Sequence, residues 1–244
     1  MPASPPVILW FRRDLRLTDN PALHHALATG RPVLPVYVRD ERLEGRPIGG
    51  ASRWWLDRSL RALDADLRTR GGRLILRRGD AEAELRRLIE ETGADQVFMN
   101  RLFEPEAFAR DADIAHGLKA DGIDCRGFNA ALLCRPGAVL NGSGQPYKVF
   151  TPFLKALLAT AEAPAGLEAP ETIPVPDAVA GEAVADWGLH PVRPDWSTGF
   201  VGTPGEAGAQ AALDAFVAGG LKTYATDRDR PDRAGTSGLS RSVA

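Results

Sequence analysis

Short apolar runs alternate with longer stretches of helical period from residue 7 to about residue 128. Strands and helices that alternate in this way form parallel sheets, because each helix carries the chain back to the start of the next strand. The pattern therefore predicts an α/β fold built on a five-stranded, doubly wound parallel sheet. The predicted strands are Val7–Phe11, Val33–Val38, Arg73–Leu76, Gln96–Met99 and Ile123–Phe128, and the predicted helices lie near 21–28, 51–70, 81–92 and 105–120.

The second predicted helix has a clear apolar stripe. Leu56, Leu60, Leu63 and Leu67 recur at steps of three and four residues, which places them on one helix face. We expect this face to pack on the sheet, which is a structural role. The chain has 244 residues, 44% of them apolar, and that is enough for one good-sized core and one or two domains.

The first predicted strand delivers a charged cluster, residues 12–16, to the start of a helix. Thr18, Asp19 and Asn20 can each accept hydrogen bonds from free helix N–H groups, and Pro21 suits the first helical position. The turn thus lies at the carboxyl end of a strand, where open α/β sheets bind ligands. Its arginines and aspartate either line such a crevice or solvate a strand end, and these residues alone leave both interpretations open.

Composition and motif searches exclude several classes of function. The formal net charge of −2 gives no overall attraction to nucleic acid, so any DNA contact needs a local patch. Neither GxGxxG after the first strand nor GxxxxGK[ST] occurs, so neither a standard dinucleotide fingerprint nor a P-loop supports nucleotide chemistry in this half of the chain. The histidines lack metal-ligand spacing and Cys125 and Cys134 lack CxxC spacing, so we expect no metal and two buried free thiols. With no signal segment and no run of ~20 apolar residues, we expect a cytoplasmic protein without a membrane span.

The composition changes after residue 160. Prolines and acidic residues alternate between 161 and 187, without lysine or arginine, which predicts a semi-extended acidic linker. Residues 204–219 then predict one more helix, which Thr203-Pro204 start and Gly219-Gly220 end. Nothing in the sequence indicates an oligomeric state.

A polar segment near the end of the sequence could bind an anion. It runs from Tyr224 through Asp227-Arg228-Asp229 to Gly235-Thr236-Ser237-Gly238-Leu239-Ser240. Hydroxyl groups and small residues let a backbone approach phosphate oxygens and donate N–H and O–H groups to them. The alternative is a polar tail, in which Arg228 is a surface side chain paired with Asp227 or Asp229.

Four motifs, in order along the chain, resemble the DNA photolyase/cryptochrome family. The opening strand leads into the family's WFRRDLRL-like segment and a DNP-like helix start, at residues 10–21. Further matches lie at Asn100–Pro105 with Ala109–Asp111, at Tyr147–Phe153 and from Tyr224 to Ser240. Together they span most of the chain.

The resemblance implies that the last motif holds the diphosphate of FAD. It places FAD contacts at Tyr224, Thr236, Ser237, Leu239 and Ser240, and it matches Arg228 to a basic position that approaches the DNA backbone in relatives. A phosphate contact of this kind positions a protein on DNA and carries no sequence information. Gly238 departs from the family, which usually has arginine there.

The resemblance also implies a light-harvesting antenna, such as a folate, a deazaflavin or a second flavin, near the carboxyl ends of the strands. Folate-binding members use an Asn-Glu pair where this chain has Glu106 and Ala107, which puts the usual folate contacts in doubt. The alternative is a cleft filled by side chains or water. The candidate antenna residues are Trp10, Phe11, Arg12, Arg39, Asp40, Asn100 and Arg101.

By this resemblance, we expect residues 1–130 to form an α/β antenna domain, 131–200 a connection with the acidic linker, and 201–244 the truncated beginning of a helical FAD domain. The implied activity is light-driven, FAD-dependent repair of cyclobutane pyrimidine dimers in damaged DNA. Because the family's catalytic half is absent, we identify no catalytic residue and expect the chain alone to be inactive. The alternatives are a cryptochrome-like blue-light sensor and a non-catalytic chromophore-binding or nucleotide-binding α/β module.

Overall fold

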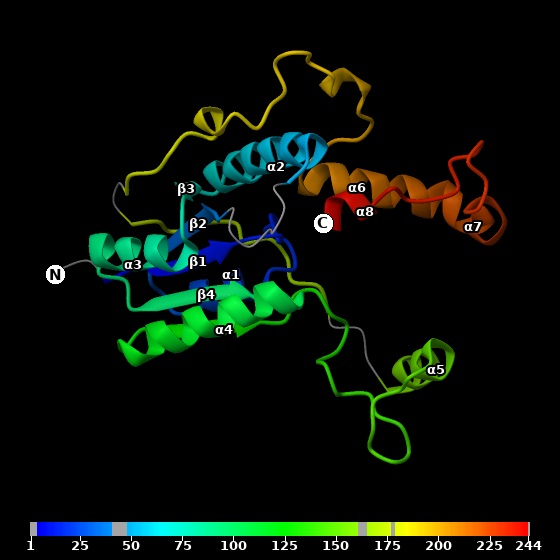
Figure 1. Cartoon of the computed structure of the whole chain (residues 1–244), viewed down its shortest axis with the longest axis horizontal. Coiled ribbons are helices and arrows are strands. Elements are labelled where there is room, and N and C mark those ends of the chain that lie inside the picture. Colours follow the sequence, from blue (N-terminus) through cyan, green and yellow to red (C-terminus); the bar gives the residue numbers. More distant parts are fainter. Residues whose placement is uncertain (1–3, 41–47, 161–164, 177–178, 244) are drawn as a thin grey trace.

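The computed structural model describes residues 4–40, 48–160, 165–176 and 179–243. It contains a five-stranded parallel sheet in the order β3-β2-β1-β4-β5, with a helix between successive strands (Figure 1). The chain starts in the middle and winds outward both ways, which confirms the predicted doubly wound sheet. The elements are β1 (Val7–Phe11), α1 (Pro21–Leu27), β2 (Val33–Arg39), α2 (Gly50–Arg68), β3 (Ile75–Arg78), α3 (Ala81–Thr92), β4 (Gln96–Asn100), α4 (Pro105–Ala120) and β5 (Asp124–Phe128).

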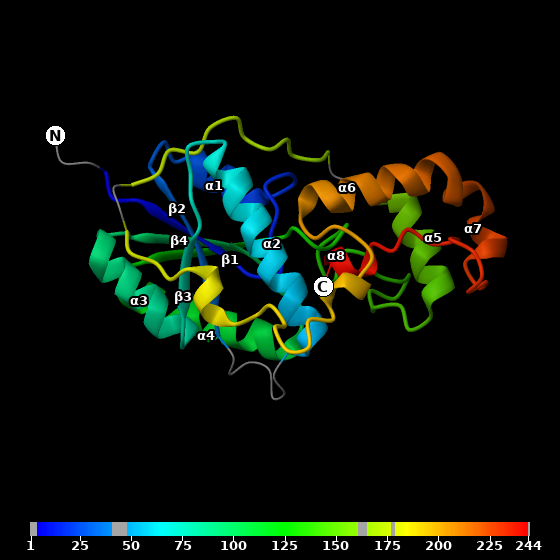
Figure 2. The ribbon, with the colours of Figure 1, turned by 90° about the horizontal axis from the view of Figure 1, so that it is seen from above.

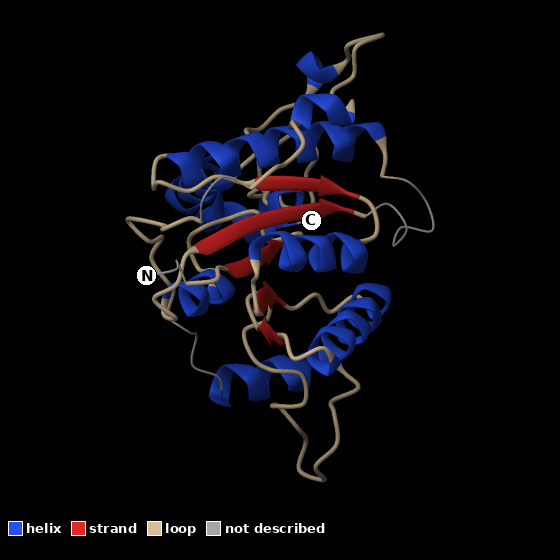
Figure 3. Cartoon of the chain, turned by 90° about the vertical axis from the view of Figure 1, so that its left-hand side faces the viewer, coloured by secondary structure: helices blue, strands red, loops and turns tan. Residues whose placement is uncertain are grey.

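Helices cover both faces of the sheet, and each face has its own apolar core (Figure 3). Alternate residues of a strand point to opposite faces. Accordingly, Leu9 of β1 packs with the α1 and α2 side, whereas Trp10 packs with the α3 and α4 side. Every residue of β1 is buried, as expected for the central strand of such a sheet.

Local sequence signals explain the helix boundaries of this unit. The side chain of Asn20 accepts a hydrogen bond from the Leu23 N–H at the start of α1, and Pro21 occupies the first helical position. In α2, Leu60 and Leu67 of the predicted stripe are buried in the core. The predicted structural role of that stripe is confirmed.

Two predicted boundaries were wrong. The third strand was expected over 73–76 but lies at Ile75–Arg78, because parallel pairing of Arg39 with Arg78 extends it beyond the apolar run. The helix expected over 204–219 begins two residues later and does not stop at Gly219-Gly220. A glycine costs a helix only about 1 kcal/mol, and here a π-helical turn carries the chain onward. The segments are α6 (Glu206–Ala215), the π turn (Phe216–Gly220) and α7 (Leu221–Asp227).

The segment expected to be a linker runs along the sheet unit and is partly buried in it. We call its described residues, 165–176 and 179–189, the strap; 161–164 and 177–178 of the predicted linker lie outside the described residues. The backbone N–H of Ile173 donates to the carbonyl of Arg70, and that of Glu182 donates to Leu76. The side chains of Ile173 and Trp187 are buried in the core beneath α1 and α2. The strap is extended, as predicted, but it also completes one core of the sheet.

Two further groups of helices project from one end of the sheet unit (Figures 1 and 2). One is α5 (Phe150–Thr160), in which Leu157 is the buried residue. The other is formed by α6, the π turn and α7, in which no described residue is buried. The remaining short elements are 3₁₀ turns at Val184–Trp187 and Ser197–Gly199 and the helix α8 (Ser240–Val243). Within the part of the chain that is described, no helix is both long and apolar enough to cross a membrane.

Candidate functional site

Arg12 lies at the carboxyl end of β1 and is buried there. Its guanidinium donates to Asp111 Oδ2 at 2.9 Å and to the carbonyl of Asn100, and it lies 4.4 Å from the ring centroid of Trp10. Burial lowers the pKa of Arg12 below its usual value, while the carboxylates of Asp111 and Asp14 raise it. The ion pair and the aromatic contact thus offset the cost of burying the charge.

Asn100, at the end of β4, organises the turn after β1. Its amide nitrogen donates to Asp14 Oδ2 at 2.7 Å and to Asn20 Oδ1 at 2.8 Å. Its amide oxygen accepts from the Ala22 N–H at 3.1 Å. Both ends of the amide therefore have partners within the protein, and Asn100 fixes the start of α1 against β4.

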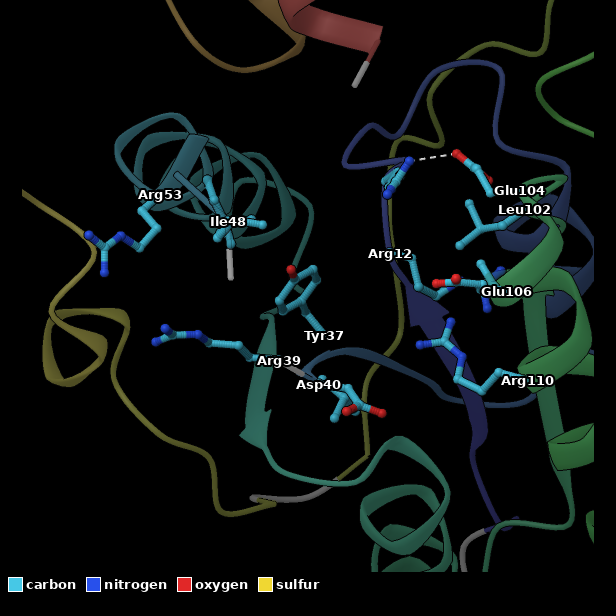
Figure 4. A pocket seen from close by; sticks show the side chains of 14 residues that line it. Arg12, Tyr37, Arg39, Asp40, Ile48, Arg53, Leu102, Glu104, Glu106 and Arg110 are labelled. Carbon is cyan, nitrogen blue, oxygen red and sulfur yellow. Dashed lines mark hydrogen bonds and ion pairs between the residues drawn. The ribbon is translucent and has the colours of Figure 1, made fainter. Parts of the chain in front are cut away.

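A cleft of about 220 Å³ opens beside Arg12, between the carboxyl ends of β1 and β2 and the first turns of α2 and α4 (Figure 4). It lies at the edge of the sheet where open α/β proteins bind ligands. The lining residues are Arg12, Arg13, Tyr37, Val38, Arg39, Asp40, Ile48, Arg53, Leu56, Leu102, Glu104, Glu106, Ala107 and Arg110.

Positive side chains outnumber negative ones around the cleft, by five arginines to three carboxylates. Several of the arginines are held in place: Arg13 contacts Glu104 at 2.5 Å, and Arg39 donates to the carbonyl of Trp187 at 3.0 Å. Among the described residues, Arg12 Nε is buried without a hydrogen-bond partner. The cleft therefore favours a ligand that joins a flat ring to an anionic or hydrogen-bond-accepting group.

The predicted antenna residues divide into two groups. Arg12, Arg39 and Asp40 line the cleft. The others do not: Trp10 lies beneath the guanidinium groups of Arg12 and Arg110, and Phe11 belongs to the core on the opposite face. Arg101 packs closely against the backbone of Gly127 and Asn100 is used internally, as described above.

Sequence reasoning missed most of the α4 and α2 side of the cleft. Arg110 lies four residues after Glu106 and three after Ala107, which places it on the same helix face as both, so helical spacing could have found Arg110. Tyr37 is on β2, where only its position near the strand end gave a signal. Ile48 and Leu56 are distant in sequence from the end of β1, and no sequence pattern indicated that they line the cleft.

Tyr224 lies on α7, with its side chain partly exposed. Its ring meets the ring of Phe216 edge to face at a centroid distance of 5.7 Å, and Arg228 lies over it at the same distance. Gly235 brings the following turn back against α7: a Cβ atom there would lie 2.3 Å from the backbone of Asp227. The predicted flavin segment thus folds on itself, with glycine at the close approach.

The hydroxyl-bearing part of that segment is a turn that leads into α8. The Leu239 N–H donates to Ser237 Oγ at 3.4 Å, while Thr236 and Ser240 are exposed. Gly238 has a φ of +64°, a left-handed conformation that favours glycine, and the guanidinium of Arg241 lies over it. The backbone geometry and this neighbour account for a residue without a side chain at position 238.

Arg228 forms an exposed ion pair with Asp229 at 3.5 Å, one of the pairings expected for a surface residue. Asp227 instead pairs with Arg233 at 3.2 Å. Exposed pairs of this kind contribute about 0–1 kcal/mol. A phosphate group could therefore compete for Arg228 at little cost.

The cysteines were expected to be buried, and that was wrong: Cys125 and Cys134 are free and partly exposed. Cys125 lies on β5, an edge strand that pairs with β4 on one side and with no strand of the sheet on the other. Its sulfur is still shielded enough that burial raises the pKa of Cys125 to about 11. In the described part of the chain, no group of three or more His, Cys, Asp or Glu side chains is arranged to hold a metal ion.

Comparison with known proteins agrees with this fold. The DNA photolyase family model matches residues 7–176. Deoxyribodipyrimidine photo-lyase of Agrobacterium fabrum is 45% identical over 98% of this chain and 50% of its own length, and Cryptochrome-1 of Arabidopsis thaliana is 37% identical over 96% of this chain and 35% of its own. The crystal structure of a bacterial class III photolyase from Agrobacterium tumefaciens superposes with a TM-score of 0.93, at 44% identity, over 98% of this chain and 50% of that one.

The fold and the cleft define a doubly wound α/β protein with a cationic ligand crevice at the carboxyl edge of its sheet. With these comparisons, the chain belongs to the DNA photolyase family, which includes the cryptochromes. It spans about half the length of the photolyases that it matches.

Proposed function

We propose that this chain is the antenna-bearing part of a deoxyribodipyrimidine photolyase, which repairs cyclobutane pyrimidine dimers in DNA with light and FAD. Proteins of this family bind FAD and an antenna chromophore and act on damaged DNA. The observation that carries the proposal is the cationic cleft beside Arg12, at the ligand edge of a sheet that matches a solved photolyase. In this proposal, residues 1–130 form the antenna domain, 131–200 connect it, and 201–244 begin the helical FAD domain.

The cleft is the proposed antenna site. Arg12 and Arg110 would face an acceptor group of the chromophore, and the apolar side chains of Leu56 and Leu102 would contact its ring. Arg39 is held by the strap and would close the other side. Folate, deazaflavin and flavin all combine a flat ring with acceptor groups, so the ligand remains one of these three. Glu106 and Ala107 stand where folate-binding members have an Asn-Glu pair, which disfavours the usual folate contacts.

Tyr224, Thr236, Ser237, Leu239 and Ser240 are the proposed FAD contacts. Residues 234–243 contain no acidic side chain, so no side chain in this stretch would repel a diphosphate. Thr236 and Ser240 are exposed and able to donate O–H groups to phosphate oxygens. When bound, reduced FAD supplies the electron that splits the dimer and is returned afterwards.

Arg228 is the proposed contact to the DNA backbone. Its weak exposed pair with Asp229 leaves the guanidinium able to bind phosphate. A dimer must leave the base stack to reach a buried cofactor, so DNA binding of this kind needs a flipped nucleotide and a cavity to receive it. We assign none of this cavity to the present chain and expect the chain alone to be inactive in repair.

A second candidate is a non-catalytic chromophore-binding module. The cleft favours it, because the cleft lies within the sheet unit and its immediate surroundings and does not involve α5, α6 or α7. A cryptochrome-like sensor is a further alternative, on the similarity to Cryptochrome-1. The non-catalytic module would bind an antenna without FAD. It would not gain repair activity when the polypeptide corresponding to the other half of a photolyase is added.

The proposal is tested by ligand titration of purified wild-type and Arg110→Ala chains with reduced folate, deazaflavin and FAD, followed by absorption and fluorescence. Arg126→Ala is the matched control, because Arg126 is an exposed arginine on β5 that does not line the cleft. We expect one ligand to bind the wild type and the control and to bind Arg110→Ala at least about tenfold more weakly. Equal affinity in all three chains, or no binding by the wild type, would contradict the antenna site.

A further inference from the structure

The helices α6 and α7, with the π turn between them, form an arm that is attached to the sheet unit at one end. The arm covers residues 206–227, which corresponds to about 33 Å at the rise of a helix. It begins beside α2 and runs away from the sheet unit (Figures 1 and 2). None of the described side chains along it is buried. Its position therefore depends on the contacts at its base.

Glu206, the first residue of the arm, makes the polar contact at this base. Its Oε2 accepts from the Leu17 N–H at 2.8 Å, and its Oε1 accepts from the Thr18 N–H at 3.0 Å. Both donors belong to the turn between β1 and α1, where neither strand nor helix pairing satisfies them. One carboxylate thus satisfies two consecutive backbone donors with charge-assisted hydrogen bonds.

The turn that receives Glu206 is itself firmly fixed. The side chain of Leu17 is buried in the core. The Asp19 N–H donates to the carbonyl of Leu167 in the strap at 2.6 Å, and Arg16 donates to the carbonyl of Ala130 at 3.0 Å. The same turn begins with Arg12 and Arg13 of the cleft. A rigid connection therefore runs from the cleft to the base of the arm.

A close backbone approach forms the second contact. At Gly205 a Cβ atom would lie 2.7 Å from Cβ of Ala62 on α2, and the φ of Gly205 is +98°. Glycine is thus required both by the conformation and by the space. This contact seats the base of the arm on α2, but a glycine has no side chain with which to fix direction. The directional hydrogen bonds of Glu206 do that.

We propose that Glu206 is a positioning residue, which sets where the arm, and with it Tyr224, stands relative to the cleft. The functional meaning rests on the proposed function, in which Tyr224 contacts FAD and the cleft holds the antenna. Tyr224 lies about 27 Å along the arm from Glu206, so a tilt of about 10° at the base moves it by about 5 Å. Energy transfer between two chromophores falls steeply with their distance, which makes this joint a determinant of antenna efficiency.

The test measures the position of the arm directly and needs no chromophore. Spin labels are attached at Lys119→Cys on α4 and Lys222→Cys on α7, two exposed sites, in a chain in which Cys125 and Cys134 are replaced by serine. Double electron–electron resonance then gives the distance distribution between the labels. The variants are Glu206→Gln, whose amide nitrogen cannot accept a hydrogen bond, and Glu206→Ala. Asp214→Asn, at an exposed carboxylate on the same helix, is the matched control.

We expect both Glu206 variants to shift the mean distance by about 5 Å or to broaden its distribution correspondingly, while Asp214→Asn matches the wild type. The Leu17 and Thr18 amides should exchange hydrogen about tenfold faster or more in both variants. Thermal unfolding of the sheet unit, followed by circular dichroism, should change little, which separates positioning from general stability. If Glu206→Ala does not fold, the distance distribution of Glu206→Gln tests the inference.

Unchanged distance distributions in the Glu206 variants, or the same change in Asp214→Asn, would overturn the inference. Because no flavin, antenna or DNA takes part, this outcome would leave the proposed function standing. Conversely, a chain that binds no chromophore could still show the predicted shift. The two proposals therefore fail independently.

Discussion

The sheet unit and the projecting helices use the same apolar residue types with opposite outcomes. Phe11 in β1 has no exposed surface, whereas Phe150 at the start of α5 is 70% exposed. Leu60 of α2 is buried, while Leu158 of α5 is 73% exposed. An apolar residue is thus buried only where the chain supplies a partner surface. Within this chain the sheet supplies one and the projecting helices do not.

The difference has an energetic consequence. Burying a large apolar side chain contributes about 1.5–3 kcal/mol, and the sheet unit obtains this for residues on both faces of the sheet. The helix α5 has 11 residues, fewer than the ~12–15 at which isolated helices become even marginally stable in water. We infer that the sheet unit is stable by itself and that α5, α6 and α7 gain little stability from burial within this chain.

The largest effect is expected from a matched pair of phenylalanines. Phe98→Ala removes a buried ring that packs against Phe128, and it should lower the free energy of unfolding by about 3–5 kcal/mol. Phe150→Ala removes an exposed ring and should change it by less than about 0.5 kcal/mol. Denaturant unfolding followed by circular dichroism measures both. Similar losses in the two variants would contradict the contrast between the regions.

The next effect tests whether the strap belongs to the sheet unit. Ile173→Ala should cost about 2–4 kcal/mol, because Ile173 is 1% exposed within the core beneath α1 and α2. Val192→Ala, at a residue that is 78% exposed just beyond the strap, is the control and should cost almost nothing. If Ile173→Ala unfolds at the same denaturant concentration as the control, the strap is a linker after all.

A smaller, pH-dependent effect is expected at Glu182. Burial raises the pKa of Glu182, but hydrogen bonds from Trp187 and Arg78 together lower it by more than burial raises it. The net pKa therefore lies below the usual value of 4.5. Its contribution to stability is therefore present above pH 4.5 and is lost as the pH falls through the lowered pKa. Because the carboxylate is partly exposed, we expect less than about 1 kcal/mol at pH 7.

Unfolding curves of wild type, Glu182→Gln and Glu171→Gln between pH 7 and pH 3 check this. Glu171 is an exposed carboxylate of the same strap and serves as the control. The stability gap between wild type and Glu182→Gln should close at acid pH, while Glu171→Gln follows the wild type throughout. A gap that widens toward acid pH would show that the sign is wrong.

The smallest effect leaves stability unchanged and concerns the reactivity of Cys125 in the folded and unfolded chain. Cys125 lies in the sheet and burial raises its pKa to about 11, so at pH 8 about one molecule in a thousand carries the thiolate. Cys134 lies in the segment that follows the sheet. Alkylation by iodoacetamide at pH 8, mapped by mass spectrometry, should modify Cys125 far more slowly in the folded chain than in urea. Equal rates in both conditions would place Cys125 outside the shielded part of the sheet.

The sequence predicted what depends on local pattern. Alternation and helical spacing located the sheet and the buried face of α2, and the residue types at 18–21 located the start of α1, since each depends on residues a few positions apart. The burial of Ile173 was missed, because a proline-rich acidic segment resembles a linker and the partners of Ile173 lie far away in sequence. Arg110 was missed for a similar reason: it reaches the cleft only once α4 has packed beside β1.

The most direct test of the account is an absorption spectrum of the purified chain after FAD, reduced folate and deazaflavin have each been offered and the excess removed. The chain is then illuminated in the presence of DNA that contains cyclobutane pyrimidine dimers. We predict one retained antenna chromophore and no light-dependent loss of dimers, because the cleft lies in the sheet unit and Thr236 and Ser240 of the flavin segment are exposed. Stoichiometric FAD with light-dependent dimer loss, or a chain that retains no chromophore, would contradict it.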